Sequence, residues 1–140
     1  MAALDAYKIR YLIVGGIAVG FYGSPRFTKD LDVLVAVGNL DHDRLYACLK
    51  EFGAPVGILT PAEFLNSNFI FYFGTPPWRI DILTSIPGVN FEEAFAERVT
   101  KHLGGLAVNV ISRPWLIKAK RASGRPQDLL DLKLLEAHES

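Results

Sequence analysis

Residues 11–35 read "YLIVGGIAVGFYGSPRFTKDLDVLV", and this stretch decides the fold. An apolar run ends at the pair Gly15-Gly16, and two aspartates, Asp30 and Asp32, follow inside a strand-like segment. Because side chains alternate along a strand, the two aspartates lie on one face, with Cα atoms about 6.5 to 7 Å apart. Two like charges on a half-buried face are costly without a cation. The stretch therefore predicts a positively charged partner for these carboxylates.

A third carboxylate, Asp81, stands in the apolar strand pattern "WRIDILT". If the two strands are neighbours in register, Asp30, Asp32 and Asp81 converge on one side of the sheet. Hard oxygen ligands of this kind suit Mg²⁺ or Mn²⁺, with water and substrate phosphates in the remaining positions. The alternative is a solvated polar face on an edge strand. The third aspartate and the upstream glycines favour a metal site.

The glycine pair precedes a predicted helix, "GIAVGFYG". Free backbone N–H groups and the helix dipole can hold a phosphate there, and the missing side chains permit close approach. The alternative is a simple tight turn. Arg26 is a candidate phosphate contact or a structural partner of Asp30 or Asp32. Thr28 is a candidate for a phosphate hydrogen bond, for a cap or for extended backbone.

The composition indicates one domain spanning residues 1–140, half of which are hydrophobic. The single cysteine, Cys48, excludes an intramolecular disulfide and fits a reducing compartment. With 15 basic and 15 acidic residues, the chain has no general attraction for nucleic acid. Its apolar runs are too short and too glycine-rich to span a bilayer, so we expect a soluble, cytoplasmic protein without a membrane partner.

The order of elements predicts an α+β domain with hairpin-paired strands and a helical C-terminal segment. The core is expected over about residues 1–111, and the C-terminal helices over about residues 113–139. The predicted helices cover residues 2–10, "GIAVGFYG", "DHDRLYACLKEFG", "FEEAFAERV" after an Asn90 cap, "SRPWLIKAKRA" and "GRPQDLLDLKLLEAH". The predicted strands are "DLDVLVAV", the antiparallel pair "NFIFYFG" and "WRIDILTSI", and a hairpin in "KHLGGLAVNVI".

The pattern Gly15-Gly16, Arg26-x-Thr28-x-Asp30-Leu31-Asp32 and then Asp81 resembles the nucleotidyltransferase superfamily of the polymerase-β type. It is most similar to small bacterial members, namely AbiEii-type toxin nucleotidyltransferases and the lincosamide and aminoglycoside nucleotidyltransferases. The pattern spans residues 13–83. The resemblance implies a mixed β-sheet with helices on one side and a site at the glycine-led helix.

The resemblance also implies roles. Asp30 and Asp32 would bind two divalent ions, Mg²⁺ or Mn²⁺, and Asp81 would ligate one of them and activate an acceptor hydroxyl. Gly15 and Gly16 would hold the phosphates of an NTP. The hydroxyl would attack the α-phosphorus and release pyrophosphate. The acceptor is left open among RNA (including tRNA), protein and a small molecule.

The segment "LIKAKRASGRPQDLLDL" resembles the helices that follow the core in these small members. There a lysine faces the nucleotide, and an arginine and an aspartate begin the next helix. Lys118 matches the lysine, with Lys120 as second choice, and Arg125 and Asp128 match the later pair. The alternative for Lys118 is a solvated lysine. Asp128 and Asp131 are interpreted as structural, because acidic residues suit a first helical turn.

Two departures from the family pattern leave a second hypothesis open. Many members of the superfamily have Gly-Ser at the glycine motif, whereas this chain has Gly15-Gly16. A separate acceptor-binding domain is also not expected after the core. The alternative is a non-catalytic nucleotide- or partner-binding module, such as a toxin–antitoxin component, acting as a homodimer or with a partner chain. The aromatic run "FYFGTPPW" is interpreted as hairpin core rather than as a base-stacking surface.

Overall fold

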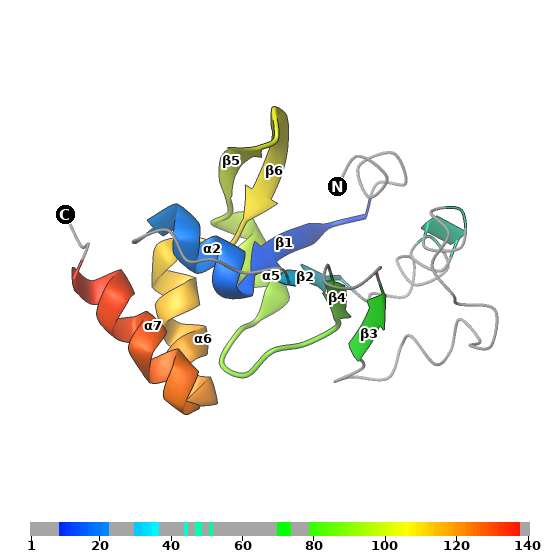
Figure 1. Cartoon of the computed structure of the whole chain (residues 1–140). Coiled ribbons are helices and arrows are strands. Elements are labelled where there is room, and N and C mark those ends of the chain that lie inside the picture. The colour runs from blue at the N-terminus through cyan, green and yellow to red at the C-terminus, as the bar shows by residue number, and fades with distance from the viewer. Residues whose placement is uncertain are drawn as a thin grey trace.

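The computed structural model describes residues 9–22, 30–36, 44, 47–48, 51, 70–73 and 79–137. The strands are β1 (Tyr11–Val14), β2 (Asp30–Val35), β3 (Ile70–Phe73), β4 (Arg79–Leu83), β5 (Val99–Leu103) and β6 (Leu106–Val110). The helices are α2 (Gly15–Tyr22), α5 (Phe91–Ala96), α6 (Arg113–Ser123) and α7 (Pro126–Ala137). The predicted α+β class, with a mixed sheet and C-terminal helices, is confirmed (Figure 1).

The strands of the described residues form one six-stranded sheet in the order β3-β4-β2-β1-β6-β5. Neighbours β1–β2, β3–β4 and β5–β6 are antiparallel, whereas β2–β4 and β1–β6 are parallel. The predicted antiparallel pair of β3 and β4 is therefore confirmed, as is the hairpin of β5 and β6. Its two turn residues, Gly104 and Gly105, have φ angles of 60° and 82°, which a two-residue hairpin turn of this kind requires.

Two predicted helices fall largely outside the described residues. Of the helix expected over residues 2–10, only Ile9 and Arg10 are described, and neither is helical. Of the helix expected over "DHDRLYACLKEFG", the described residues 44, 47–48 and 51 are helical. Within it, Cys48 is buried in the core, as the sequence indicated for a small hydrophobe.

The helix boundaries follow the signals that the sequence carries. Asn90 caps α5, because its side-chain oxygen accepts a hydrogen bond from the Glu93 backbone N–H at 3.1 Å. Pro126 is the first residue of α7, where a helix tolerates a missing N–H. Gly124 ends α6 in the left-handed conformation, with φ 63°.

Helices α2, α6 and α7 lie together beside the sheet (Figure 1), and α2 contacts β1, β2, α6 and α7. The Tyr22 hydroxyl at the end of α2 donates a 2.7 Å hydrogen bond to the Ile111 carbonyl after β6. Leu116 of α6 and Leu135 of α7 belong to the same buried hydrophobic cluster as Leu12 of β1. In the described part of the chain, every helix is too short or too polar to cross a membrane.

Leu135→Ala tests whether α7 shares the core with the sheet. The Leu135 side chain is fully buried, so its truncation should lower the free energy of unfolding by about 2 to 5 kcal/mol. Leu130→Ala is the matched control on the same helix, because that side chain is 55% exposed and its truncation should change stability by less than about 0.5 kcal/mol. Urea unfolding followed by circular dichroism measures both, and equal effects would contradict a shared core.

Candidate functional site

Asp32 and Asp81 are direct partners in the parallel pairing of β2 with β4. Partner residues of neighbouring strands lie on the same face of the sheet, and adjacent strands are about 4.8 Å apart. The two strands are therefore neighbours in register, as convergence of Asp32 and Asp81 requires. Asp30 is the partner of Arg79 at the start of the same pairing. Its backbone is described, but its side chain lies outside the described part.

The start of α2 lies directly against the Asp32 carboxylate. A Cβ atom added to Gly15 would stand 2.1 Å from Asp32 Oδ2, a distance that no real side chain permits. Gly15 also has a φ of 71°, in the left-handed region that favours glycine. The first glycine of the pair thus lets the β1–α2 junction approach the carboxylate, for two independent steric reasons.

A cavity of about 390 Å³ opens between this junction and the two C-terminal helices. It falls in the size range of small-molecule sites. Its wall combines the junction of β1 with α2, one position each of β2 and β4, the loop after β4, and the facing sides of α6 and α7. The residues that line it are Val14, Gly15, Gly16, Asp32, Leu83, Ile86, Pro87, Leu116, Ala119, Lys120, Ser123, Arg125, Pro126, Gln127, Asp128 and Asp131.

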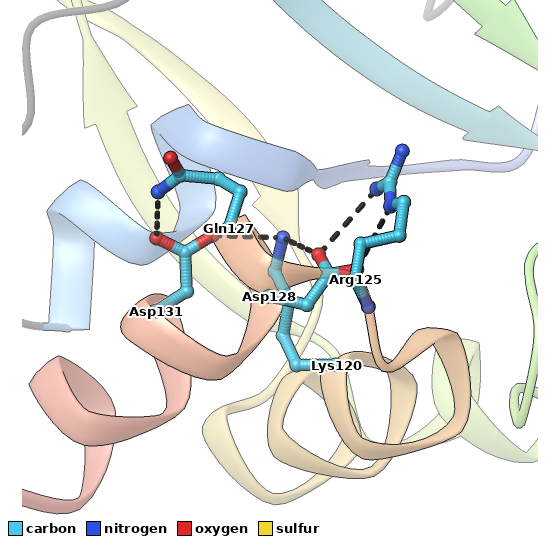
Figure 2. Close-up of polar contacts among 5 residues, drawn as sticks. All are labelled: Lys120, Arg125, Gln127, Asp128 and Asp131. Atoms are coloured by element: carbon cyan, nitrogen blue, oxygen red, sulfur yellow. Dashed lines mark hydrogen bonds and ion pairs between the residues drawn. The ribbon is translucent and has the colours of Figure 1, made fainter.

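A buried ion network forms the C-terminal wall of the cavity (Figure 2). The Lys120 ammonium of α6 lies 3.1 Å from Asp128 Oδ1 and 3.1 Å from Asp131 Oδ2, both on α7. The side chains of Asp128 and Asp131 are at most 1% exposed, and that of Lys120 is 11% exposed. Because each buried charge has an opposite charge at contact distance, the three side chains connect α6 and α7 at the cavity.

Arg125 completes the network at the edge of the cavity. Its Nε donates to Asp128 Oδ2 at 2.8 Å, and its backbone N–H donates to the same oxygen at 3.1 Å. Burial alone would raise the pKa of Asp128, but hydrogen bonds from Arg125, Ser123 and Lys120 outweigh burial and hold this pKa well below its usual range. The Arg125 side chain is 74% exposed, and the negative charge of Asp32 contributes to raising its pKa after the larger effects of Asp128.

The donor set at the strand pair fits a divalent ion. Asp32 and Asp81 are adjacent carboxylates, and hard oxygen donors suit Mg²⁺ or Mn²⁺. Within the described residues, no group of three His, Cys, Asp or Glu side chains could hold a metal ion. The side chain of Asp30, the predicted third ligand, lies outside the described part. Asp81 stands next to Asp32 in the register but is not part of the cavity lining.

The remaining predicted site residues fall into three groups. Gly15 and Gly16 line the cavity, and Arg26 and Thr28 lie outside the described residues. Lys118 is exposed and stands outside the cavity lining, with its Nζ 4.7 Å from the centre of the Trp115 ring. Nucleotide binding by Lys118 stays a prediction, whereas the lysine that lines the cavity is Lys120, the second choice of the sequence analysis.

Asp128 and Asp131 are not among the site residues that the sequence predicts. The helix dipole favours acidic residues in a first turn, and Asp128 does stand in the first turn of α7. Both are in fact buried cavity residues. A signal was present, because the buried Leu132 and Leu135 follow Asp128 and Asp131 at helical spacing, so all four occupy one buried face.

Comparisons with known proteins agree with this architecture. No family model matches the sequence, and no curated protein matches it. Among solved structures, a crystal structure of an antigenic nucleotidyltransferase-like protein from Paracoccidioides brasiliensis superposes with a TM-score of 0.56. The match covers 98% of this chain and 70% of that chain at 17% sequence identity.

This chain has a nucleotidyltransferase-like fold. At this level of sequence identity the likeness concerns the fold. The narrower resemblance to AbiEii-type and antibiotic-modifying enzymes therefore stays a prediction.

Lys120→Met and Lys118→Met form a matched pair on α6. The first removes the cation between two buried carboxylates and should lower the free energy of unfolding by about 3 kcal/mol or more. The second removes one exposed contact with an aromatic ring and should cost less than about 1 kcal/mol. Thermal and urea unfolding measure both variants, and equal losses would refute the structural role of Lys120.

The low pKa of Asp128 predicts a specific acid dependence of stability. Because this pKa is lower in the folded than in the unfolded chain, the ionised carboxylate stabilises the fold above the unfolded pKa. That contribution is lost as the pH falls toward the folded value. Between about pH 5 and pH 2, stability should therefore fall more steeply for the wild type than for Asp128→Asn. Urea unfolding across this range checks the slopes, and parallel curves would contradict the assignment.

Proposed function

We propose that this chain is a metal-dependent nucleotidyltransferase. It transfers a nucleoside monophosphate from an NTP to an acceptor hydroxyl on RNA, protein or a small molecule. The hydroxyl oxygen bonds to the α-phosphorus, the bond from that phosphorus to the bridging oxygen breaks, and pyrophosphate leaves. The hydroxyl proton passes to a carboxylate, for which Asp81 is the candidate.

One observation carries the proposal. Asp32 and Asp81 are register partners on one sheet face, and the Asp32 carboxylate touches the glycine that begins α2. Carboxylates are concentrated here although the strands around them are apolar, with Val33 and Ile82 buried beside them. Such an arrangement is unfavourable without a cation and useful with a triphosphate and its counter-ions.

The residues of the chain have separate tasks in this proposal. The free N–H groups at the start of α2 suit a phosphate, and Gly15 and Gly16 leave the backbone open to it. Arg125, exposed at the cavity edge, can turn its guanidinium toward a phosphate oxygen. Lys120 keeps its place between Asp128 and Asp131 and fixes the opposite wall. Phosphoryl transfer depends on such positioning more than on covalent help from the protein.

Asp32 and Asp81, together with Asp30, would hold the Mg²⁺ or Mn²⁺ ions. When bound, such ions supply positive charge to the phosphate oxygens and to the attacking and leaving oxygens.

The test is incorporation of label from each α-labelled NTP into RNA or protein acceptors, in parallel with pyrophosphate release. Asp32→Asn and Asp81→Asn should each lower the rate by about 100-fold or more, because each removes a charged group from the reacting centre. Glu93→Gln is the matched control, since that carboxylate is exposed on α5, and it should leave the rate unchanged.

The outcomes separate the enzyme from a binding module. Nucleotide binding without pyrophosphate release, across all four NTPs and both metals, would favour the non-catalytic alternative. Full activity in Asp32→Asn or Asp81→Asn would refute the roles given to these carboxylates.

A further inference from the structure

The buried Asp131 carboxylate fixes the side chain of Gln127 one turn before it on α7 (Figure 2). Gln127 Nε2 donates to Asp131 Oδ1 at 3.1 Å, while Asp131 Oδ2 lies 3.1 Å from the Lys120 ammonium. The Asp131 side chain is fully buried, so it cannot turn away to water. Both of its oxygens are therefore engaged, one by each neighbour.

This contact determines which end of the Gln127 amide faces the cavity. A carboxylate only accepts hydrogen bonds, so it can hold the NH₂ group of a glutamine but not its carbonyl oxygen. Turning the amide over would place the amide oxygen against an oxygen of the buried Asp131 carboxylate. Gln127 is thus locked with Nε2 on Asp131, and its Oε1 is left for another partner.

The remaining oxygen is available to a ligand. Gln127 is solvent-exposed and lines the cavity, and no donor in the described ranges bonds to its Oε1. In Figure 2 this oxygen points away from the Asp131 carboxylate. The cavity therefore presents an oriented hydrogen-bond acceptor that no described donor of the chain uses.

We propose that Gln127 is a specificity residue that accepts a hydrogen bond from a donor group of the bound nucleotide. This inference rests on the proposed function and deepens it. A nucleotide offers three kinds of donor: an exocyclic amino group of its base, a ring N–H of its base, or a ribose hydroxyl. A carbonyl oxygen of the ligand at this position would meet Oε1 without a proton between them, and that ligand would be rejected.

Part of the cavity lining is apolar and suits the face of a base. Ile86 and Pro87 of the loop after β4 and Leu116 of α6 give this side of the cavity an apolar surface. Gly88 fixes that loop on α6, because a Cβ there would stand 2.7 Å from the Ala122 Cβ. Ligand sites commonly combine such an apolar lining with a few oriented polar groups, which fix the orientation of the ligand.

The experiment measures nucleotide affinity by calorimetry with Mg²⁺, without any acceptor. GTP is compared with ITP, which lacks only the 2-amino group. ATP is compared with ITP and CTP with UTP, because in these two pairs an oxo group replaces the amino group and the neighbouring ring nitrogen gains a proton. ATP is also compared with its 2′-deoxy and 3′-deoxy forms, which lack one ribose hydroxyl. The wild type should prefer one member of at least one pair by about tenfold to hundredfold, namely the member that places a donor against Oε1. The pair that responds, and the member of it that binds more tightly, together tell an exocyclic amine, a ring N–H and a ribose hydroxyl apart.

Two variants tie the preference to Gln127. Gln127→Met keeps the length of the side chain, removes the amide and should reduce the preference to less than about threefold. Lys133→Met is the matched control, an exposed position on the same helix, and should keep the wild-type preference.

Asp131→Asn gives the sharpest result, because asparagine can donate to Oε1 and release the amide. It should weaken or reverse the preference, and a melting curve shows whether the variant is folded. If it does not fold, Gln127→Met decides.

Each remaining outcome overturns a defined statement. Nucleotide binding by the wild type with no preference in any pair would overturn the role of Gln127 alone. Retention of the full preference in Gln127→Met would do the same. Failure of the wild type to bind any nucleotide would overturn the proposed function, and the role of Gln127 with it.

Discussion

The position of the Lys120 ammonium between Asp128 and Asp131 is the interaction on which the cavity depends. It joins α6 to α7, and through Asp131 it determines how Gln127 is oriented. Replacing a buried ion network by apolar side chains is often neutral or stabilising, so such a network is weak evidence for stability as such. Its value here is geometric, because directional contacts hold two helices and one amide in a single arrangement around an open space.

Much of the fold could be predicted because its signals are local. The Asn90 cap, the Gly104-Gly105 turn and the strand alternation around Asp32 each depend on a few neighbouring residues. The order of the strands could not be read in the same way. The parallel pairing of β1 with β6 and of β2 with β4 joins distant segments, and no local pattern specifies which strands become neighbours.

Candidate site residues stand out in the sequence where their chemistry contradicts their surroundings. An aspartate inside an apolar strand is conspicuous, which is why Asp32 and Asp81 could be paired before their register was known. On an amphipathic helix a charge is ordinary, and so Lys118 and Lys120 look alike in the sequence. What separates them is the rotation of α6 against α7, which is fixed by packing of Leu116 and Leu135 in the core.

The parallel pairing of β1 with β6 also has a consequence for how the chain folds. Ile13 near the beginning of the sequence is the register partner of Val110, close to the start of the C-terminal helices. A contact of such high sequence separation must close a long loop before it contributes stability, which slows folding. During synthesis β1 and β2 leave the ribosome long before β6 is made. The sheet can therefore be completed only after Val110 at the end of β6 has emerged.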